Sequence, residues 1–375
     1  MTNGDEMKKI LCVLLMLLAV SGCTEKEPER YSMSATDIGF DTVVSFIAYT
    51  DNEAEFEKYS DKLKELFLHY DHLFDKYNSY DGINNIKTIN DNAGKQSVEV
   101  DPAIIDLLTL SKQYDSISNH QFDITMGSVF NIWHDYREEG TIANQNGTES
   151  KIPSMSELEE AQKHTGWEHV QIDEENNTVY IDDPDVSLDV GGVAKGFAVE
   201  LIAEELENEG LEHAIINGGG NIRLIGNKPV DDTWSVGIQI PNLDVQATDS
   251  LVSIKSNGDT SFVTSGDYQR YYTYNGEIMH HIIDPDTLMP ARHCRSVTVI
   301  TKNSGIADIL STTLYSMTHQ EGVEFLNKLK EEEGIEANAI WVYNENQPKE
   351  DDTESFSKDG YEIVFSDGLK DTISQ

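Results

Sequence analysis

Residues 187–198, Ser-Leu-Asp-Val-Gly-Gly-Val-Ala-Lys-Gly-Phe-Ala, combine groups that could bind a negatively charged ligand. An apolar run that holds Asp189 turns through Gly191 and Gly192 and enters a region of helical periodicity that holds Lys195. Glycines let the backbone approach a ligand closely, and the first N–H groups of a helix attract anions. We therefore expect a strand, a glycine turn and a helix N-terminus that bind an anion. A tight turn beside a surface lysine is the simpler alternative, because neither the Walker pattern nor G-x-G-x-x-G is present.

A second group of polar residues occurs in residues 304–314, which we expect to form a helix capped by Ser304. Asp308 and Thr312 lie four residues apart and therefore share one face of that helix. A carboxylate and a hydroxyl are hard oxygen ligands that suit Mg²⁺, and the sequence has no His/Cys set with zinc spacing. Two side chains are too few to enclose the ion, so backbone carbonyls, water or a substrate phosphate must complete the site. A hydrogen bond between Asp308 and Thr312 is the alternative.

A third polar group spans two stretches, residues 263–271 and residues 280–291. The first has a glycine turn, hydroxyl groups and Arg270, and the second has His281 at the end of an apolar run, just before a proline turn. These residue types could contact a ligand. A solvent-facing pair of histidines is the alternative.

The charge of the chain limits its possible partners. The sequence has 375 residues, with 27 Lys and Arg against 68 Asp and Glu, and a formal net charge of −41. Its length allows one large domain or two modest ones. Its charge argues against binding nucleic acid. An anionic substrate would be repelled by this surface, so binding one requires a local cationic pocket or a metal ion.

The N-terminal residues predict an address outside the cytoplasm. Residues 1–22 have two lysines followed by an apolar run that is too short to span a membrane as an ordinary helix. The run ends in Val-Ser-Gly-Cys, which is similar to a bacterial lipoprotein signal with Cys23 as the lipidated residue. Residues 23–35 are then expected to be a polar lipid-anchored tether, and residues 36–372 the folded domain. This arrangement places the protein at the cell membrane, on its extracytoplasmic face.

The three cysteines agree with this interpretation. Cys12 leaves with the signal and Cys23 carries the lipid, so Cys294 alone remains in the folded domain and is expected to be packed. Translation could begin at Met1 or Met7, because acidic residues are unusual before such a signal.

The hydrophobic pattern predicts helices and strands without strict alternation, and hence an α+β or mixed α/β fold. The expected helices include residues 53–74, 102–114, 194–209, 305–317 and 320–333. The expected strands are residues 38–49, two within 168–190, and 213–217, 222–225, 234–240, 251–256, 259–264, 278–283, 296–301, 338–344 and 361–365.

Five motifs taken together resemble the ApbE-like FAD:protein FMN transferases, which are often bacterial lipoproteins. The motifs, in order, are 189–196 (DVGGVAKG), 217–221 (NGGGN), 265–270 (SGDYQR), 281–285 (HIIDP) and 307–312 (ADILST). The resemblance covers roughly residues 36–370. It implies a two-lobed catalytic domain with the site in the cleft between the lobes. It also implies Mg²⁺-dependent transfer of FMN from FAD to a Thr or Ser hydroxyl of a partner protein, with release of AMP.

The resemblance also implies roles for individual residues. Asp308, Thr312 and the carbonyl of Gly192 match the metal ligands. The residues that match FAD contacts are Phe40, Tyr77, Gln121, Phe122, Asp123, Asp189, Lys195 and Ile283. The sequence departs from the family pattern at Phe40, where many members have methionine, at Asp41-Thr42 in place of Gly-Thr, and at Leu288 in place of glycine.

The implied reaction needs a base for the acceptor hydroxyl. His281 is our first choice, since histidine titrates near neutrality, and Asp284 is the second. The acceptor would be an exported subunit of an electron-transfer complex. Two alternatives remain open: an Mg²⁺-dependent FAD pyrophosphatase that gives FMN and AMP, and a non-catalytic flavin-binding lipoprotein.

Overall fold

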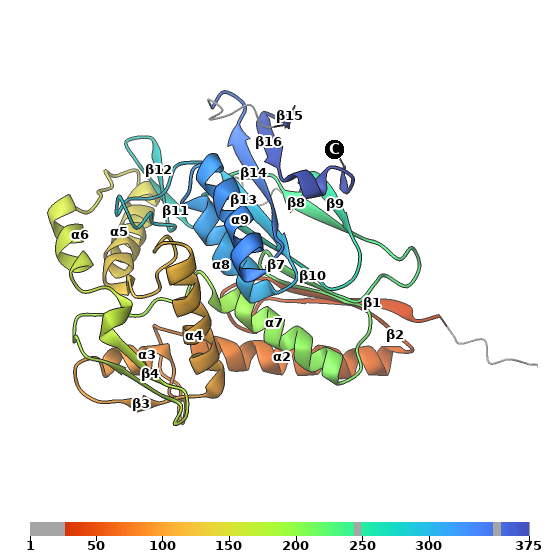
Figure 1. Ribbon diagram of the computed structural model, residues 1–375, viewed down its shortest axis with the longest axis horizontal. Coiled ribbons are helices and arrows are strands. Elements are labelled where there is room, and N and C mark those ends of the chain that lie inside the picture. Colours follow the sequence, from red (N-terminus) through yellow and green to blue (C-terminus); the bar gives the residue numbers. More distant parts are fainter. Residues whose placement is uncertain (1–26, 244–248, 348–353, 375) are drawn as a thin grey trace, which may run out of the picture.

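The computed structural model describes residues 27–243, 249–347 and 354–374. Helices and strands are mixed along the chain, which confirms the predicted fold class. Figure 1 shows two groups of elements side by side, a large sheet with its covering helices and a smaller, mostly helical group built around α3 to α6. The predicted signal, residues 1–22, and Cys23 lie outside the described residues.

The large sheet has nine strands in the order β1-β2-β6-β7-β10-β13-β14-β16-β15, and neighbouring strands are antiparallel. Its strands are β1 (Glu29–Ala35), β2 (Val44–Thr50), β6 (Ala214–Gly218), β7 (Asn221–Ile225), β10 (Thr260–Gly266), β13 (Ser296–Thr301), β14 (Asn338–Asn344), β15 (Ser355–Lys358) and β16 (Tyr361–Phe365).

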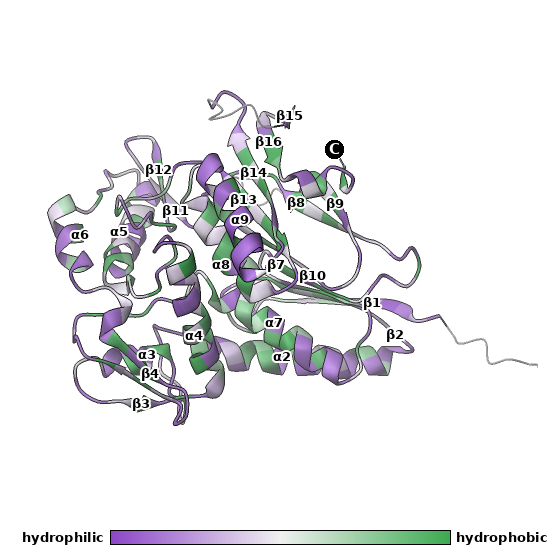
Figure 2. Cartoon of the chain, viewed as in Figure 1, coloured by the Kyte–Doolittle hydropathy of each residue, from purple (hydrophilic) through white to green (hydrophobic). Residues whose placement is uncertain are grey.

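Helices cover one face of this sheet. Their bounds are α2 (Glu53–Phe74), α7 (Ala194–Asn208), α8 (Ser304–Tyr315) and α9 (His319–Glu333). Phe46 of β2 and Ile216 of β6 pack with Leu63 of α2 and Ile202 of α7 in one apolar cluster. Along its length α2 carries both hydrophilic and hydrophobic residues (Figure 2), because only one side of the helix faces the sheet.

The opposite face is covered by a three-stranded sheet in the order β17-β9-β8. Its strands are β8 (Trp234–Gln239), β9 (Ser250–Ser256) and β17 (Ile373–Ser374). Trp234 and Ile254 from this sheet pack against Leu224 and Phe262 of the large one. The central strands are therefore buried on both faces, as the six buried residues of β13 illustrate.

The smaller group has two further sheets, β3-β5-β4 and β11-β12. Its elements are α3 (Ile86–Asp91), β3 (Val98–Glu99), α4 (Pro102–Ile117), α5 (Gly127–Gln145), α6 (Met155–Gln162), β4 (Val170–Asp173), β5 (Thr178–Ile181), β11 (Tyr271–Tyr274) and β12 (Glu277–His280). Trp133 of α5, Leu158 of α6 and Tyr272 of β11 share one apolar cluster.

The long periodic segments were predicted well. Helix α2 has the predicted bounds, and α4 begins after an Asp101 cap whose side chain accepts the Ala103 N–H at 2.9 Å. Cys294 is buried, as expected. In the part of the chain that the structure describes, no helix is both long enough and apolar enough to cross a membrane.

Four expected element boundaries were wrong. Residues 29–35, expected within the tether, form β1 and pair with β2. The strand expected at residues 38–49 begins only at Val44, after a bent segment. The strand expected at residues 278–283 ends at His280. Helix α8 is capped by Asn303, whose side chain accepts the Ile306 N–H, and not by Ser304.

Helix α5 was not predicted at all. Its N-cap residue, Met126, makes no side-chain cap, and Gly127 and Gly140 interrupt the helical pattern. A Cβ at Gly140 would lie 2.2 Å from Cδ2 of Tyr272, so this glycine lets the Tyr272 ring pack directly on the helix. Packing of β11 thus fixes a helix whose sequence lacks start signals.

Candidate functional site

A pocket of about 350 Å³ lies where the two groups of elements meet. Its lining comes from the segment before β2, the end of α2 and the residues after it, the segment before α5, α5 itself, the glycine bend (residues 189–192), the start of α7, Arg270 between β10 and β11, the segment after β12, and α8. Among the predicted residues, those on its wall are Phe40, Tyr77, Gln121, Phe122, Asp123, Asp189, Gly192, Lys195, His281, Ile283 and Thr312. Asp284 and Asp308 lie outside this lining.

The glycine bend is not preceded by a strand, contrary to the prediction. Ser187 makes one isolated parallel bridge with Met126, and the Asp189 N–H donates to the carbonyl of Ile124 at 2.8 Å. The bend is therefore attached to the segment before α5. Helix α7 does begin at Ala194, as predicted.

Two buried carboxylates join α7 and α8 reciprocally. Asp308 of α8 accepts the Gly196 N–H in the first turn of α7 at 2.8 Å. Glu200 of α7 accepts the Ser304 N–H at the start of α8 at 2.5 Å. Helix N-termini favour such negative partners. The Asp308 carboxylate therefore supplies part of the negative charge that was predicted to bind at the N-terminus of α7.

Thr312 points toward the glycine bend. A Cβ built on Gly192 would lie 3.3 Å from Thr312 Oγ1 and 3.2 Å from Cε2 of Phe122. Ser265 at the end of β10 is also close, with its Oγ 3.5 Å from Thr312 Oγ1 and 2.8 Å from Ser311 Oγ. The two halves of the predicted metal site are therefore brought together by tertiary structure.

The predicted metal ligands are chemically suited to Mg²⁺. Asp308 is only 5% exposed, and burial raises its pKa against the opposing effects of the Lys195 charge and the Gly196 N–H. A buried carboxylate is stable only when another charge or hydrogen bonds compensate it. The Thr312 hydroxyl and the Gly192 backbone add hard oxygen atoms, so the donor set fits a hard divalent cation.

Besides Lys76, which is paired with Asp189, three cationic side chains line the same pocket. Lys195 follows the bend, Arg137 comes from α5, and Arg270 lies between β10 and β11. Within the described residues none of the three forms an ion pair, although Arg137 Nη2 donates to His134 Nδ1 at 2.9 Å. They supply the local positive charge that an anionic ligand needs in this acidic protein.

His281 lines the pocket near these cations. Burial, then His280, Arg270, Arg137 and Lys195, lower its pKa well below the ordinary value. Its Nδ1 is buried and has no hydrogen-bond partner among the described residues. These causes favour the neutral ring, contrary to the expected titration near neutrality.

His280 is not half of a solvent-facing pair. It is 4% exposed, its Nε2 donates to the carbonyl of Ala291 at 2.7 Å, and its Nδ1 accepts the Ile282 N–H at 3.2 Å. The second contact requires the neutral ring, because a protonated Nδ1 has no lone pair to accept a hydrogen bond. Burial lowers the pKa of His280 to about 4.

The carboxylate of Asp284 is used in a turn. One oxygen accepts the Asp286 N–H at 2.9 Å, and the other accepts the Thr287 hydroxyl at 2.9 Å. Leu288, where the family pattern has glycine, has a φ of 58° and a buried side chain. This geometry favours a turn-forming role for Asp284, and its role as the second-choice base stays a prediction.

The Phe40 segment departs from the family pattern in a related way. Phe40 and Asp41 have φ values of 57° and 47°, in the left-handed region that glycine favours. The Phe40 N–H donates to Asp71 Oδ1 at 2.6 Å, which holds this turn against the end of α2. Tertiary contacts thus stabilise a conformation that the sequence does not favour.

The next predicted FAD residues form the wall beside α5. Gln121 Nε2 donates to Asp286 Oδ2 at 2.9 Å, and Asp123 Oδ1 accepts both the N–H and the hydroxyl of Thr125. Phe122 is buried beside the bend. This wall is therefore ordered by its own hydrogen bonds.

Sequence reasoning missed several pocket residues. Trp133, His134 and Arg137 line the pocket from α5 at helical spacing, which could have identified that helix. Lys76, next to Tyr77, forms a 2.6 Å ion pair with Asp189. No local sequence pattern predicts this ion pair, because Lys76 and Asp189 lie far apart in the sequence.

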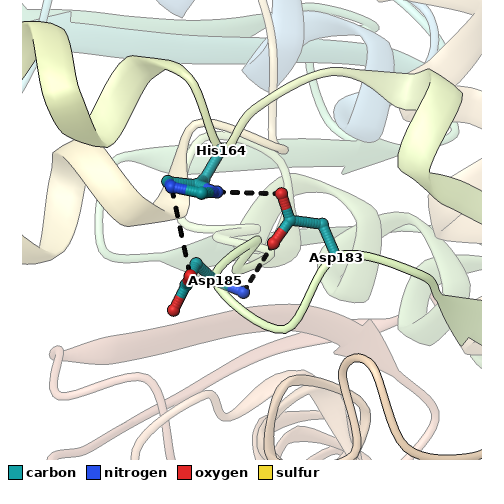
Figure 3. Close-up of side chains that lie close together, drawn as sticks. All are labelled: His164, Asp183 and Asp185. Atoms are coloured by element: carbon teal, nitrogen blue, oxygen red, sulfur yellow. Dashed lines mark hydrogen bonds and ion pairs between the residues drawn. The ribbon is translucent and has the colours of Figure 1, made fainter.

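A different group of potential ligands lies away from this pocket lining. His164, Asp183 and Asp185 have ligand atoms within 4.8 Å of one another (Figure 3). His164 Nδ1 lies 2.8 Å from Asp183 Oδ2, and Asp183 also accepts the Asp185 N–H at 2.9 Å. These groups already satisfy one another, and none of them belongs to the predicted magnesium set.

Comparisons with known proteins agree with the geometry. The model of the ApbE family matches residues 40–338. FAD:protein FMN transferases from Vibrio cholerae and Haemophilus influenzae are 27% and 26% identical to this chain, covering 84% and 86% of it and 90% and 91% of their own lengths.

Solved structures show the same fold. The ApbE protein from Thermotoga maritima has a TM-score of 0.69 and 27% identity, covering 84% of this chain and 94% of its own. The flavin transferase ApbE from Vibrio cholerae has a TM-score of 0.68 at 23% identity, covering 92% and 99%, which supports the fold alone. Fold and relatives define a transferase enzyme. The chain belongs to the ApbE family.

Proposed function

We propose that this enzyme transfers the FMN part of FAD to a Ser or Thr hydroxyl of an exported acceptor protein, in an Mg²⁺-dependent reaction that releases AMP. The observation that carries the proposal is the meeting of Thr312 with the Gly192 bend, beside Asp308 and three cationic side chains. FAD contains a diphosphate, so a protein of net charge −41 can bind it only where such positive charge is concentrated.

In the proposed step, the acceptor oxygen attacks the phosphorus of the FMN unit. The bond from that phosphorus to the bridging oxygen breaks, and AMP leaves with that oxygen and the electron pair. The proton of the acceptor hydroxyl passes to a ring nitrogen of His281, which is neutral and can accept it. Mg²⁺ bound by Asp308, Thr312 and the Gly192 carbonyl would neutralise charge on the phosphates.

Binding of FAD would change the pKa of His281, the proposed base. The charges of Arg270, Arg137 and Lys195 lower the pKa of His281. A bound diphosphate offsets those charges, so the pKa of His281 rises when FAD is present. The ring therefore becomes a better proton acceptor when the substrate is in place.

We also propose that the acceptor is a subunit of an electron-transfer complex and that Cys23 anchors the enzyme to the extracytoplasmic face of the membrane. The proposal rests on the signal-like N-terminal sequence and on the resemblance stated above. Fractionation of cells that express Cys23→Ser tests the anchor, because lipidated protein sediments with membranes. Wild-type chain in the soluble fraction would contradict it.

The decisive experiment incubates the full chain with FAD, Mg²⁺ and candidate exported acceptors. We expect the acceptor mass to increase by one FMN and an equal amount of AMP to appear, only when all components are present. Asp308→Asn keeps an oxygen for the Gly196 N–H but removes the charge. It should lower turnover at least about a thousandfold, equivalent to about 4 kcal/mol of lost stabilisation. The exposed Asp106→Asn is the matched control.

Other outcomes would contradict specific parts of this proposal. AMP formed at full rate without an acceptor would indicate an FAD pyrophosphatase. Intact FAD after long incubation with Mg²⁺ would indicate a binding protein. Wild-type turnover in Asp308→Asn would rule out the metal assignment.

A further inference from the structure

Lys76 connects three segments that border the pocket. It follows the end of α2, and its side chain is only 8% exposed. Its Nζ lies 2.6 Å from Asp189 Oδ2 and donates to Asn131 Oδ1 of α5 at 2.8 Å. A lysine with so little contact with water needs such partners, because burying an unpaired ammonium group is costly.

Asp189 transmits this contact to the glycine bend. Its second oxygen, Oδ1, accepts the Gly191 N–H at 2.9 Å, so one carboxylate joins Lys76 to the bend. Burial raises the pKa of Asp189, but the charge of Lys76 and its hydrogen bond outweigh that effect and the net shift is downward. The carboxylate is therefore held in its charged form and in one orientation.

Charge explains why this matters for a phosphorylated ligand. Without Lys76, the Asp189 carboxylate would present an unpaired negative charge at the bend, beside the pocket where a diphosphate must approach. The ion pair cancels that charge locally, which leaves Lys195, Arg137 and Arg270 free to act on the ligand.

We infer that Lys76 is a positioning residue that neutralises and orients Asp189, so that the glycine bend accepts the diphosphate of FAD. The inference rests on the proposed function, because it takes FAD as the ligand. A purely structural ion pair between the end of α2 and the glycine bend would also explain the distances, and the two roles make different predictions for ligands with and without phosphate.

The test measures the affinity of the full chain for FAD and for riboflavin by flavin fluorescence, with Mg²⁺ present. Lys76→Met should weaken FAD binding about tenfold or more and leave riboflavin binding within about twofold, since riboflavin has no phosphate. Lys76→Arg keeps the charge and should restore most of the FAD affinity. Lys87→Met is the control, because Lys87 pairs with Asp91 on α3, outside the pocket lining.

Two results would overturn the inference: unchanged FAD affinity in Lys76→Met, or an equal loss of FAD and riboflavin affinity. Retained riboflavin binding also shows that the variant is folded. In the transfer reaction, Lys76→Met should raise KM for FAD more than it lowers kcat. If the wild-type chain binds FAD but transfers no FMN, the proposed function fails, and the binding comparison still decides the role of Lys76.

Discussion

Two regions near the pocket accommodate crowded backbones in opposite ways. One is the junction, where the first turns of α7 and α8 meet, and the other is the turn of residues 284–288 after β12. At the junction, Gly196 leaves no side chain between the helices: a Cβ there would lie 2.3 Å from the Ser304 carbonyl oxygen and 2.5 Å from Asp308 Cβ. In the turn, Leu288 keeps a large buried side chain although its φ is 58°.

The contacts that each region makes explain this difference. The junction sets the position of Asp308 through hydrogen bonds to backbone N–H groups, so the two helices must approach closely. The turn presents Ile283 and Pro285 to the pocket and is held by the Leu288 carbonyl, which accepts the Trp133 indole N–H at 2.8 Å. Burial of the Leu288 side chain offsets the strain of its backbone. Where two backbones approach this closely, no side chain fits. A left-handed backbone conformation still accommodates a side chain, at a cost in conformational free energy.

The largest effect is expected from breaking the junction with Gly196→Ala. The added methyl group meets backbone and cannot be relieved by a rotamer change, so we expect a loss of about 3 kcal/mol in the free energy of unfolding. Urea unfolding of the full chain measures it. Gly322→Ala in α9 is the control, because its nearest neighbours are side-chain atoms of Leu314 and Trp341 at 3.2 and 3.3 Å. Equal stability of the two variants would contradict the proposed rigidity of the junction.

A second prediction concerns how stability depends on pH, and it tests the buried His280, which precedes the turn. Because the folded pKa of His280 is about 4, below its ordinary value of 6.5, the unfolded chain binds more protons between these values. Stability should therefore fall as pH decreases, and His280 should account for about 2 kcal/mol between pH 7 and pH 5. Denaturant unfolding of wild type and His280→Gln at both pH values measures this share.

His164 provides a control of opposite sign for that experiment. Its hydrogen bond to Asp183 raises the pKa of His164, so its contribution is present at low pH and is lost as pH rises through the folded pKa. His164→Gln should make the loss of stability toward pH 5 steeper, while His280→Gln should make it shallower. An unchanged slope in His280→Gln would refute the assignment.

The smallest effect compares two replacements of Leu288. Both remove buried surface, but alanine keeps the strain of a positive φ and glycine does not. Leu288→Gly should therefore be more stable than Leu288→Ala by about 1 kcal/mol. At Leu310 of α8, which is fully buried in an ordinary helix, the order should reverse. The same order at both positions would show that the turn is not strained. Thermal or urea unfolding gives both differences.

The amino-acid sequence determined the features that depend on local pattern. The bounds of α2 and the start of α7 at Ala194 follow from periodicity, and the start of α4 at Pro102 follows from its Asp101 cap. It also determined that Asp308 and Thr312 share a helix face, since four residues make about one turn. Residue types marked Lys195, Arg270 and His281 as candidate ligand contacts, but their order along the chain shows no common location, so only the resemblance indicated that they share one site.

Tertiary structure decided the rest. It formed α5 by packing β11 on Gly140, and it placed residues 29–35 in the sheet. It also engaged the Asp284 carboxylate in hydrogen bonds within a turn. It also brought Lys76 to Asp189 and gave His280 and His281 pKa values well below those of free histidine. These properties arise from burial and from charges on distant segments, and neither is present in the chain until it folds.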